Sequence, residues 1–320
     1  MPRGRKIVKE IELECCTLRT SANEFYRHNR IKGLSQPTQE GYKGYVECFL
    51  RWCGEDTYTD EVTTRKLEDY ISFKQDEGKN NDVSIATIMV HLRRFFNFCA
   101  SRNYMEKIEV TIPKFEEKIK EPYANEEIKL LLARPKSNRW VEWRCWAMTN
   151  YYYSTGQRLS TVLNIKVSHL DLDNARVKLI WNKDKKQKYM PISSALVKVL
   201  REYIELSDLK EQDYLFPHYE GGKLSVRGAQ DALNNYNHSR GIDTTGTHKY
   251  RHTFAKGYLQ NGGNAVKLQK LLNHKTIEQT MRYVNLYTSD ISSDLDLFNP
   301  LDNFKKKNYT PTKRKTVIGA

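Results

Sequence analysis

The 320-residue sequence lacks most of the short motifs that mark a common enzyme class. It contains no phosphate-binding loop of the GxxxxGKS type, no GxSxG nucleophile turn and no Rossmann glycine pattern. Walker-type nucleotide hydrolases, α/β-hydrolases and dinucleotide-dependent dehydrogenases are therefore disfavoured.

The spacing of the cysteines does not suit a metal site. The six cysteines form no CxxC pair and no zinc-finger spacing. Cys48, Cys53 and Cys99 fall on apolar helical stripes, so we expect buried thiols in a reducing compartment. The basic start, MPRGRKIVKE, lacks the apolar core of a signal peptide, and no run is long enough to span a membrane. We expect a cytoplasmic protein.

Acidic residues are too few to balance the basic ones. The sequence has 53 Lys and Arg against 39 Asp and Glu, a formal net charge of +14. Such an excess favours a polyanionic partner, of which DNA and RNA are the common ones. It would also fit a solvated basic surface without a partner.

Pattern changes along the chain predict five parts. We expect a basic arm, a helical domain, a linker, a larger domain of mixed structure and a polar, basic tail, with bounds at 1–12, 13–112, 113–121, 122–290 and 291–320. The linker region, IPKFEEKIKEPYA, has two prolines, many charges and little apolar periodicity, which is typical of exposed interdomain chain.

The first domain is expected to be a four-helix bundle. Helices are predicted near 13–30, 37–53, 63–78 and 84–103, mostly from the spacing of their apolar residues. Pro37 lies near the start of the second helix and Gly78 ends the third. Basic residues such as Arg51, Arg93 and Arg94 are expected on the outer faces.

The second domain mixes helices with a small sheet. Helices are predicted over 125–132 and 140–156, and the aromatic bulk of the second suggests that it lies at the centre of the domain. Three short strands are predicted at 167–170, 175–181 and 188–192. The chain is helical again after Ser194, so the fold class is mainly α with a small antiparallel β-sheet.

Six residues at the edges of these elements could do chemistry together: Arg158, Lys183, His248, Arg251, His274 and Tyr283. Each alone has an ordinary structural explanation. His248 and His252 have the spacing of a zinc pair, but Lys249 stands where a zinc protease has its glutamate, so we expect no metal.

The six residue types match what metal-free phosphoryl transfer requires. Two arginines can clamp the oxygens of a phosphodiester in its transition state, a lysine can protonate the leaving 5′-oxygen, and a base can activate a tyrosine hydroxyl. A phosphotyrosine bond keeps the energy of the broken phosphodiester, so rejoining needs no ATP and no cofactor.

Order and local context resemble the tyrosine recombinases, the family of phage integrases and Xer proteins. The segment STGQRLSTVLNIKVSHLDLDNARVKLIWNKDKKQKYMPIS resembles the family stretch from the first arginine through the lysine hairpin. THKYRHTFA resembles its H-x-x-R-H-T box, and LLNHKTIEQTMRYVNL its G-H-x(8)-Y box. GLSQPTQEGY and FFNFCASRNY resemble its N-terminal core-binding bundle. The resemblance covers about residues 15–290.

The resemblance implies a role for each of the six residues. Arg158 and Arg251 would hold the scissile phosphate, and His274 would hydrogen-bond it. His248 would assist proton transfer to and from Tyr283, the nucleophile that forms a 3′-phosphotyrosine. Lys183 would be the general acid, although Lys185, Lys186 and Lys188 crowd the same turn.

Three positions depart from the family pattern or complicate it. Thr161 stands where the family often has an acidic residue. Because that residue has a supporting role, we expect this replacement to modify the activity rather than abolish it. Asn273 replaces a glycine, which a left-handed turn tolerates. Tyr287 is a possible rival nucleophile, but its spacing from His274 does not fit the family.

The resemblance implies a site-specific recombinase that acts on double-stranded DNA as a homo-tetramer on two sites. The tail could dock on a neighbouring protomer through FNPLDNF, and accessory DNA-bending proteins are possible partners. We favour integration or excision of a mobile element over Xer-like dimer resolution. Less favoured functions are those of a type IB topoisomerase, a binding protein without catalysis, and a metal-dependent nuclease or helix-turn-helix regulator.

Overall fold

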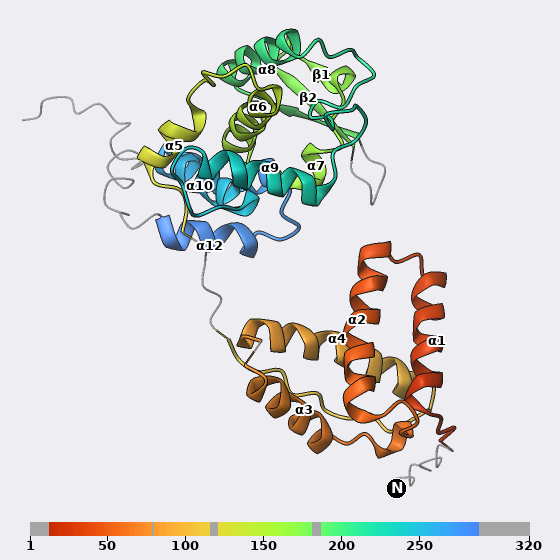
Figure 1. Ribbon diagram of the computed structural model, residues 1–320. Coiled ribbons are helices and arrows are strands. Elements are labelled where there is room, and N and C mark those ends of the chain that lie inside the picture. The colour runs from red at the N-terminus through yellow and green to blue at the C-terminus, as the bar shows by residue number, and fades with distance from the viewer. Residues whose placement is uncertain (1–12, 79, 116–120, 181–186, 288–320) are drawn as a thin grey trace, which may run out of the picture. The chain divides into compact units, whose positions relative to one another are not determined.

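The computed structural model describes residues 13–78, 80–115, 121–180 and 187–287. The chain divides into two compact units, residues 1–119 and 120–320 (Figure 1). This division falls at the end of the predicted linker. The predicted arm and tail lie outside the described residues.

The N-terminal unit is a bundle of four helices. They are α1 (Leu18–Ile31), α2 (Gln36–Cys53), α3 (Thr64–Asp76) and α4 (Asp82–Ser101), with a 3-10 turn at Thr59–Glu61. Side-chain oxygens of Thr17, Thr63 and Asn81 accept hydrogen bonds from the first turns of α1, α3 and α4. Pro37 lies in the first turn of α2, as predicted. Helix α4 begins two residues before the predicted Ser84, because Asn81 is its cap.

Helix α4 is the centre of this bundle, since it packs against α1, α2 and α3. Its buried Phe95 contacts Phe25 of α1 at a ring distance of 5.5 Å, and Phe96 contacts Phe49 of α2 at 5.5 Å. Arg93 and Arg94 lie on the opposite, exposed side of α4. The prediction of outward-facing basic residues is confirmed for both.

The C-terminal unit surrounds one helix, α6, with the other elements (Figure 1). Its helices are α5 (Asn125–Leu132), α6 (Trp140–Thr155), α7 (Leu159–Val162), α8 (Ser194–Leu206), α9 (Val226–His238), α10 (Thr247–Gln260), α11 (Ala265–Leu272) and α12 (Glu278–Tyr287). Helix α6 packs against α5, α8, α9 and α10 and is buried along most of its length. The predicted central position of this aromatic helix is confirmed.

A three-stranded antiparallel sheet completes the C-terminal unit. Its order is β1 (Leu170–Asp171), β2 (Arg176–Ile180) and β3 (Gln187–Pro191), with Val177 paired to Met190. The first strand was predicted at 167–170 but lies at Leu170–Asp171, because Val167–His169 form a 3-10 turn. The backbone N–H groups of Val167 and Ser168 donate instead to the carbonyls of Asp213 and Glu211. These acceptors lie more than 40 residues away, so the local pattern could not reveal them.

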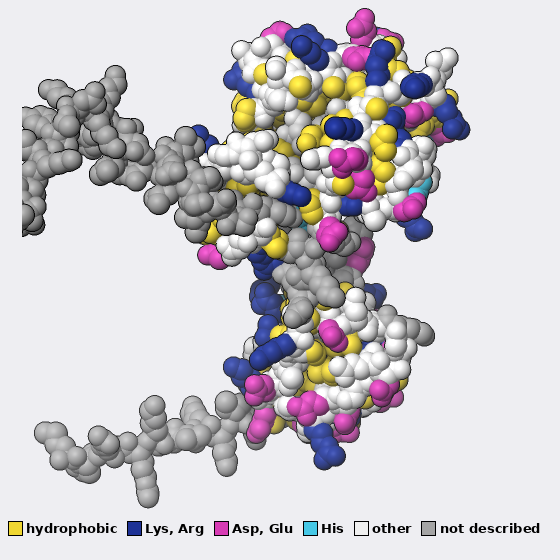
Figure 2. Space-filling view, turned by 90° about the vertical axis from the view of Figure 1, so that its left-hand side faces the viewer, with side chains coloured by type: hydrophobic (Ala, Val, Ile, Leu, Met, Phe, Trp, Pro, Cys, Tyr) yellow, Lys and Arg dark blue, Asp and Glu magenta, His cyan; other side chains and the backbone are white. Residues whose placement is uncertain are grey.

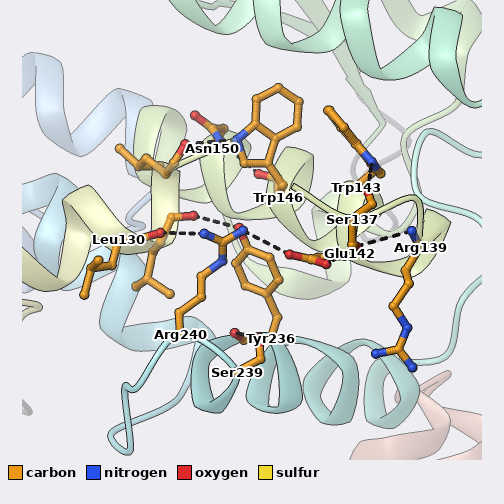
Figure 3. Close-up of polar contacts among 12 residues, drawn as sticks. Leu130, Ser137, Arg139, Glu142, Trp143, Trp146, Asn150, Tyr236, Ser239 and Arg240 are labelled. Carbon is orange, nitrogen blue, oxygen red and sulfur yellow. Dashed lines mark hydrogen bonds and ion pairs between the residues drawn. The ribbon is translucent and has the colours of Figure 1, made fainter. Parts of the chain in front are cut away.

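Arg240 connects three elements of the C-terminal unit (Figure 3). Its guanidinium donates to the Leu130 carbonyl at 2.9 Å, forms an ion pair with Glu142 at 3.3 Å and lies 4.4 Å from the ring centre of Tyr236. These partners lie in α5, α6 and α9. Side-chain exposure is 14% for Arg240 and 27% for Glu142, so solvent screens this pair only partly.

Tyr123, at the start of the C-terminal unit, contacts two residues of α10. The backbone N–H of Tyr123 donates to Thr253 Oγ1 at 2.9 Å, and Lys249 Nζ lies 4.3 Å from the Tyr123 ring centre. Both partners belong to α10, the helix that also carries His248 and Arg251. Residues 130 positions apart are therefore joined beside the candidate site.

Candidate active site

A sharp turn at Gly156 ends α6 and begins the candidate site. Gly156 has φ 59° and ψ 18°, the left-handed conformation that favours glycine. A Cβ atom here would lie 2.4 Å from Phe254 Cδ1 and 2.8 Å from Leu272 Cδ2. The turn therefore requires glycine, and it directs the chain towards Arg158, the residue that precedes α7.

Arg251 is a buried arginine held by two backbone carbonyls. Only 5% of its surface is exposed, and its Nη1 and Nη2 donate to the carbonyls of Gly156 at 2.8 Å and Leu272 at 2.7 Å. Burial, together with the nearby charge of Arg158, lowers the pKa of Arg251 to about 10. The guanidinium thus stays charged at neutral pH and has a fixed orientation.

Arg158 is held by the same turn as Arg251. Its Nη1 donates to the carbonyl of Asn273 at 3.3 Å, and the side chain is otherwise exposed. Asn273 ends α11 in the left-handed conformation, with φ 50°, as predicted. Because Leu272 and Asn273 are consecutive, the carboxyl end of α11 places two guanidinium groups side by side, where the helix dipole favours positive charge.

Tyr283 lies on α12 beside the buried arginine. The residue is 7% exposed, and the charges of the Arg251 and Arg158 guanidinium groups act on its phenol. Burial raises the pKa of Tyr283 above its ordinary value, while Arg251 and Arg158 oppose the shift. The phenol is thus protonated at neutral pH, and its attack on any group would require a base.

Two histidine rings flank Tyr283. The His274 ring is parallel to the Tyr283 ring within 2°, with centroids 6.1 Å apart, and the His252 ring lies at 5.5 Å and 47°. Burial, followed by the charges of Arg251 and Arg158, lowers the pKa of His274 to about 4. His274 is therefore neutral at neutral pH.

The structure brings four of the six predicted residues together: Arg158, Arg251, His274 and Tyr283. His248 is exposed and precedes Arg251 by three residues on α10, so both lie on one side of this helix. Lys183 lies outside the described residues, as do Lys185 and Lys186.

The fourth lysine of that turn, Lys188, belongs to β3 and pairs with Leu179. The sequence did not single out Thr280, which hydrogen-bonds His274, and it singled out His252 only as a zinc-pair candidate. Helical spacing could have revealed Thr280, because it precedes Tyr283 by three residues.

Other features of the C-terminal unit lie apart from this cluster. A pocket of about 850 Å³ opens at the amino end of α6, with Trp140, Tyr219 and Tyr236 among its lining residues, whereas Gly156 follows the other end of that helix. Within the described part of the chain, no group of three or more His, Cys, Asp or Glu residues could hold a metal. In the same part, no helix has the length and apolar character needed to cross a membrane.

The sequence matches the model of the phage integrase family over residues 123–290, more than half of the chain. The chain belongs to this family. The match includes every position of the candidate site, so the chain is a tyrosine recombinase, an enzyme of site-specific recombination.

Known relatives agree with this assignment. The recombinase is 25% identical over 295 residues to tyrosine recombinase XerD of Staphylococcus aureus, covering 88% of this chain and 99% of the relative. It is 29% identical over 264 residues to a tyrosine recombinase of Pseudothermotoga lettingae, covering 80% and 90% of the two chains.

Solved structures share the fold of the recombinase at low sequence identity. A lambda integrase tetramer bound to a Holliday junction matches with a TM-score of 0.69 at 17% identity, over 84% of this chain and 78% of that one. The Tn1549 transposon integrase in complex with transposon right end DNA matches with a TM-score of 0.71 at 14% identity, over 83% and 94%.

Proposed function

We propose that this recombinase cuts and rejoins DNA strands through a covalent bond between Tyr283 and a 3′-phosphate. The observation that supports this most is the position of Tyr283 beside two fixed guanidinium groups, because the charges of Arg251 and Arg158 act on its phenol. A phosphodiester clamped by Arg251 and Arg158 would lie next to the attacking oxygen. Two fixed cations there would stabilise the charge that develops on the phosphate oxygens.

In the proposed cleavage step, the Tyr283 oxygen forms a bond to phosphorus while the bond from phosphorus to the 5′-oxygen breaks. Tyr283 is protonated at neutral pH, so its proton must leave as the bond forms, and we assign His248 to assist this transfer. Lys183 would protonate the leaving 5′-oxygen, and His274 would hydrogen-bond the phosphate. Attack by a 5′-hydroxyl of another strand reverses the step and rejoins the DNA without ATP.

The proposed substrate is double-stranded DNA with specific recombination sites, bound by both units. Supporting this, Arg93 and Arg94 project from α4. On the visible face of the C-terminal unit, Lys and Arg side chains are interspersed with Asp and Glu (Figure 2). The net charge of +14 favours phosphate contacts and steep salt dependence.

We also propose that four protomers act on two sites. The lambda integrase structure with a Holliday junction, which shares this fold, contains a tetramer. A tail that docks on a neighbouring protomer and accessory DNA-bending proteins belong to the same proposal. The tail lies outside the described residues.

For the biological role, we propose integration or excision of a mobile genetic element. We favour this role over Xer-like dimer resolution because the sequence has diverged, with 25% identity to a XerD protein. Selection of bound sequences from random DNA, followed by their location in the source genome, tests this. Sites at both ends of one element would support the proposal, and a single chromosomal site would indicate dimer resolution.

Covalent trapping tests the proposed chemistry. The protein would be incubated without metal with nicked suicide substrates that carry a selected site. Wild type and Tyr287→Phe should form a protein–DNA adduct, and Tyr283→Phe should bind the DNA without forming one. An adduct formed by Tyr283→Phe, or magnesium-dependent cutting without an adduct, would overturn the proposal.

A further inference from the structure

The imidazole of His274 forms a hydrogen bond with the buried hydroxyl of Thr280 on α12. Nδ1 of His274 lies 2.7 Å from Oγ1 of Thr280, and Thr280 has 0% exposed surface. The backbone N–H of Thr280 donates to the Ile277 carbonyl at 2.8 Å. The hydroxyl end of the contact is therefore shielded from water.

A neutral imidazole carries one proton, and its position decides what the ring can bind. One ring nitrogen then donates a hydrogen bond and the other accepts one. His274 is neutral at neutral pH. Because Thr280 engages Nδ1, Nε2 is the nitrogen that can meet a bound phosphate. A phosphate oxygen only accepts hydrogen bonds, so Nε2 must hold the proton.

We propose that Thr280 is a positioning residue, whose hydroxyl donates to Nδ1 of His274 and so keeps the proton on Nε2, facing the scissile phosphate. This rests on the proposed function, in which His274 binds that phosphate. The opposite tautomer would direct a lone pair at the phosphate and repel it.

The helix geometry gives Thr280 a second effect. Thr280 and Tyr283 are three residues apart on α12 and therefore lie on one side of the helix. The His274 and Tyr283 rings are parallel within 2°. Because the nucleophile and the hydroxyl that orients the imidazole belong to one helix, their spacing is fixed by that helix.

Paired substitutions test the role of the hydroxyl. Thr280→Val removes the hydroxyl and keeps the shape, whereas Thr280→Ser keeps the hydroxyl. Loss of the outer partner of a metal-bound histidine lowers function about 10- to 100-fold, and we expect a similar slowing of adduct formation in Thr280→Val with unchanged DNA binding. Thr280→Ser should react within about twofold of wild type, by the same hydrogen-bond reasoning.

Thr149→Val is the matched control for the loss of a buried hydroxyl. Thr149 is 0% exposed and its Oγ1 lies 3.4 Å from the Tyr250 hydroxyl, within the same unit. This variant should change the melting temperature without slowing adduct formation. Equal slowing in Thr149→Val and Thr280→Val would indicate a general effect on stability and would overturn the proposal.

A double-mutant cycle with His274 separates positioning from simple support of α12. In the His274→Asn background, Thr280→Val should cause no further slowing, because the imidazole it orients is absent. If the double variant formed the adduct more slowly than His274→Asn, by the factor that Thr280→Val causes alone, the proposal would be contradicted.

Nitrogen NMR of wild type reads the tautomer directly and does not depend on whether Thr280→Val folds. The His274 signal should show the proton on Nε2, and a proton on Nδ1 would overturn the inference. Failure of the proposed function would look different, since wild type itself would then form no adduct.

Discussion

Arg251 Nη1 donates a 2.8 Å hydrogen bond to the carbonyl of Gly156, a residue 95 positions earlier in the chain. The acceptor is oriented by a left-handed turn that only glycine fits without a clash. The orientation of the guanidinium thus depends on a residue that has no side chain of its own. Backbone geometry at Gly156 and at the end of α11 is therefore part of the site.

Gly156→Ala should impair both folding and strand cleavage. The added methyl group would meet Phe254 and Leu272 and would strain the left-handed backbone, at a cost of about 1–3 kcal/mol. Thermal melting and adduct formation measure the two effects. Gly257→Ala is the matched control, because Gly257 lies within α10 with nothing within 4 Å of the added methyl group, and it should raise stability slightly. Equal behaviour of the two variants would contradict this account of the turn.

His274 should make the free energy of unfolding depend on pH in one window. Its pKa is lowered from 6.5 to about 4 in the folded protein. Between these values the unfolded chain binds the proton more readily, so stability falls as pH decreases from about 6.5 towards 4, and His274 has no effect above this window. The side chain is half-buried, so solvent screening reduces the loss.

Urea melts of wild type and His274→Asn at pH 7.5 and pH 5 check this pH dependence. The variant should lose less stability on acidification than wild type, since asparagine does not titrate. An identical loss in both proteins would show that other groups cause the dependence.

Arg240→Met should destabilise the C-terminal unit. The substitution removes a carbonyl hydrogen bond and leaves Glu142 without its cationic partner in a partly buried position. We expect a loss of about 1–3 kcal/mol and a melting temperature several degrees lower. The control is Arg227→Ala, whose ion pair with Asp231 is long, at 3.9 Å, and largely exposed. Arg227→Ala should leave the melting temperature unchanged.

Arg93→Ala and Arg94→Ala should weaken DNA binding in a salt-dependent manner. Each phosphate contact that is lost should reduce the slope of log affinity against log salt by about 0.9. Titrations at several salt concentrations measure this slope. Arg19→Ala is the control, because Glu47 and Glu55 already pair with Arg19 within the bundle. The slope of Arg19→Ala should equal that of wild type. Unchanged slopes in all three variants would show that Arg93 and Arg94 do not contact the DNA.

Local patterns predicted most helices, because caps and apolar spacing act within one or two turns. The Pro37 start is an example, and the left-handed Asn273 could be inferred from its turn position. The strand predicted from Val167 was wrong at its start, because the backbone N–H of Val167 donates to Asp213, which lies far along the chain. Sequence alone grouped the six candidate residues by resemblance. It could not predict that backbone carbonyls hold the two arginines, since these contacts exist only in the folded unit.

The long chain separations at the site bear on when activity can arise. Contacts between residues 95, 115 and 130 positions apart close large loops, and such contacts are slow to form during folding. A newly made chain that has completed α12 but not these loops would carry Tyr283 without its paired guanidiniums. Such a chain would lack the arrangement that we propose for cleavage, so cleavage activity should arise only with the complete fold.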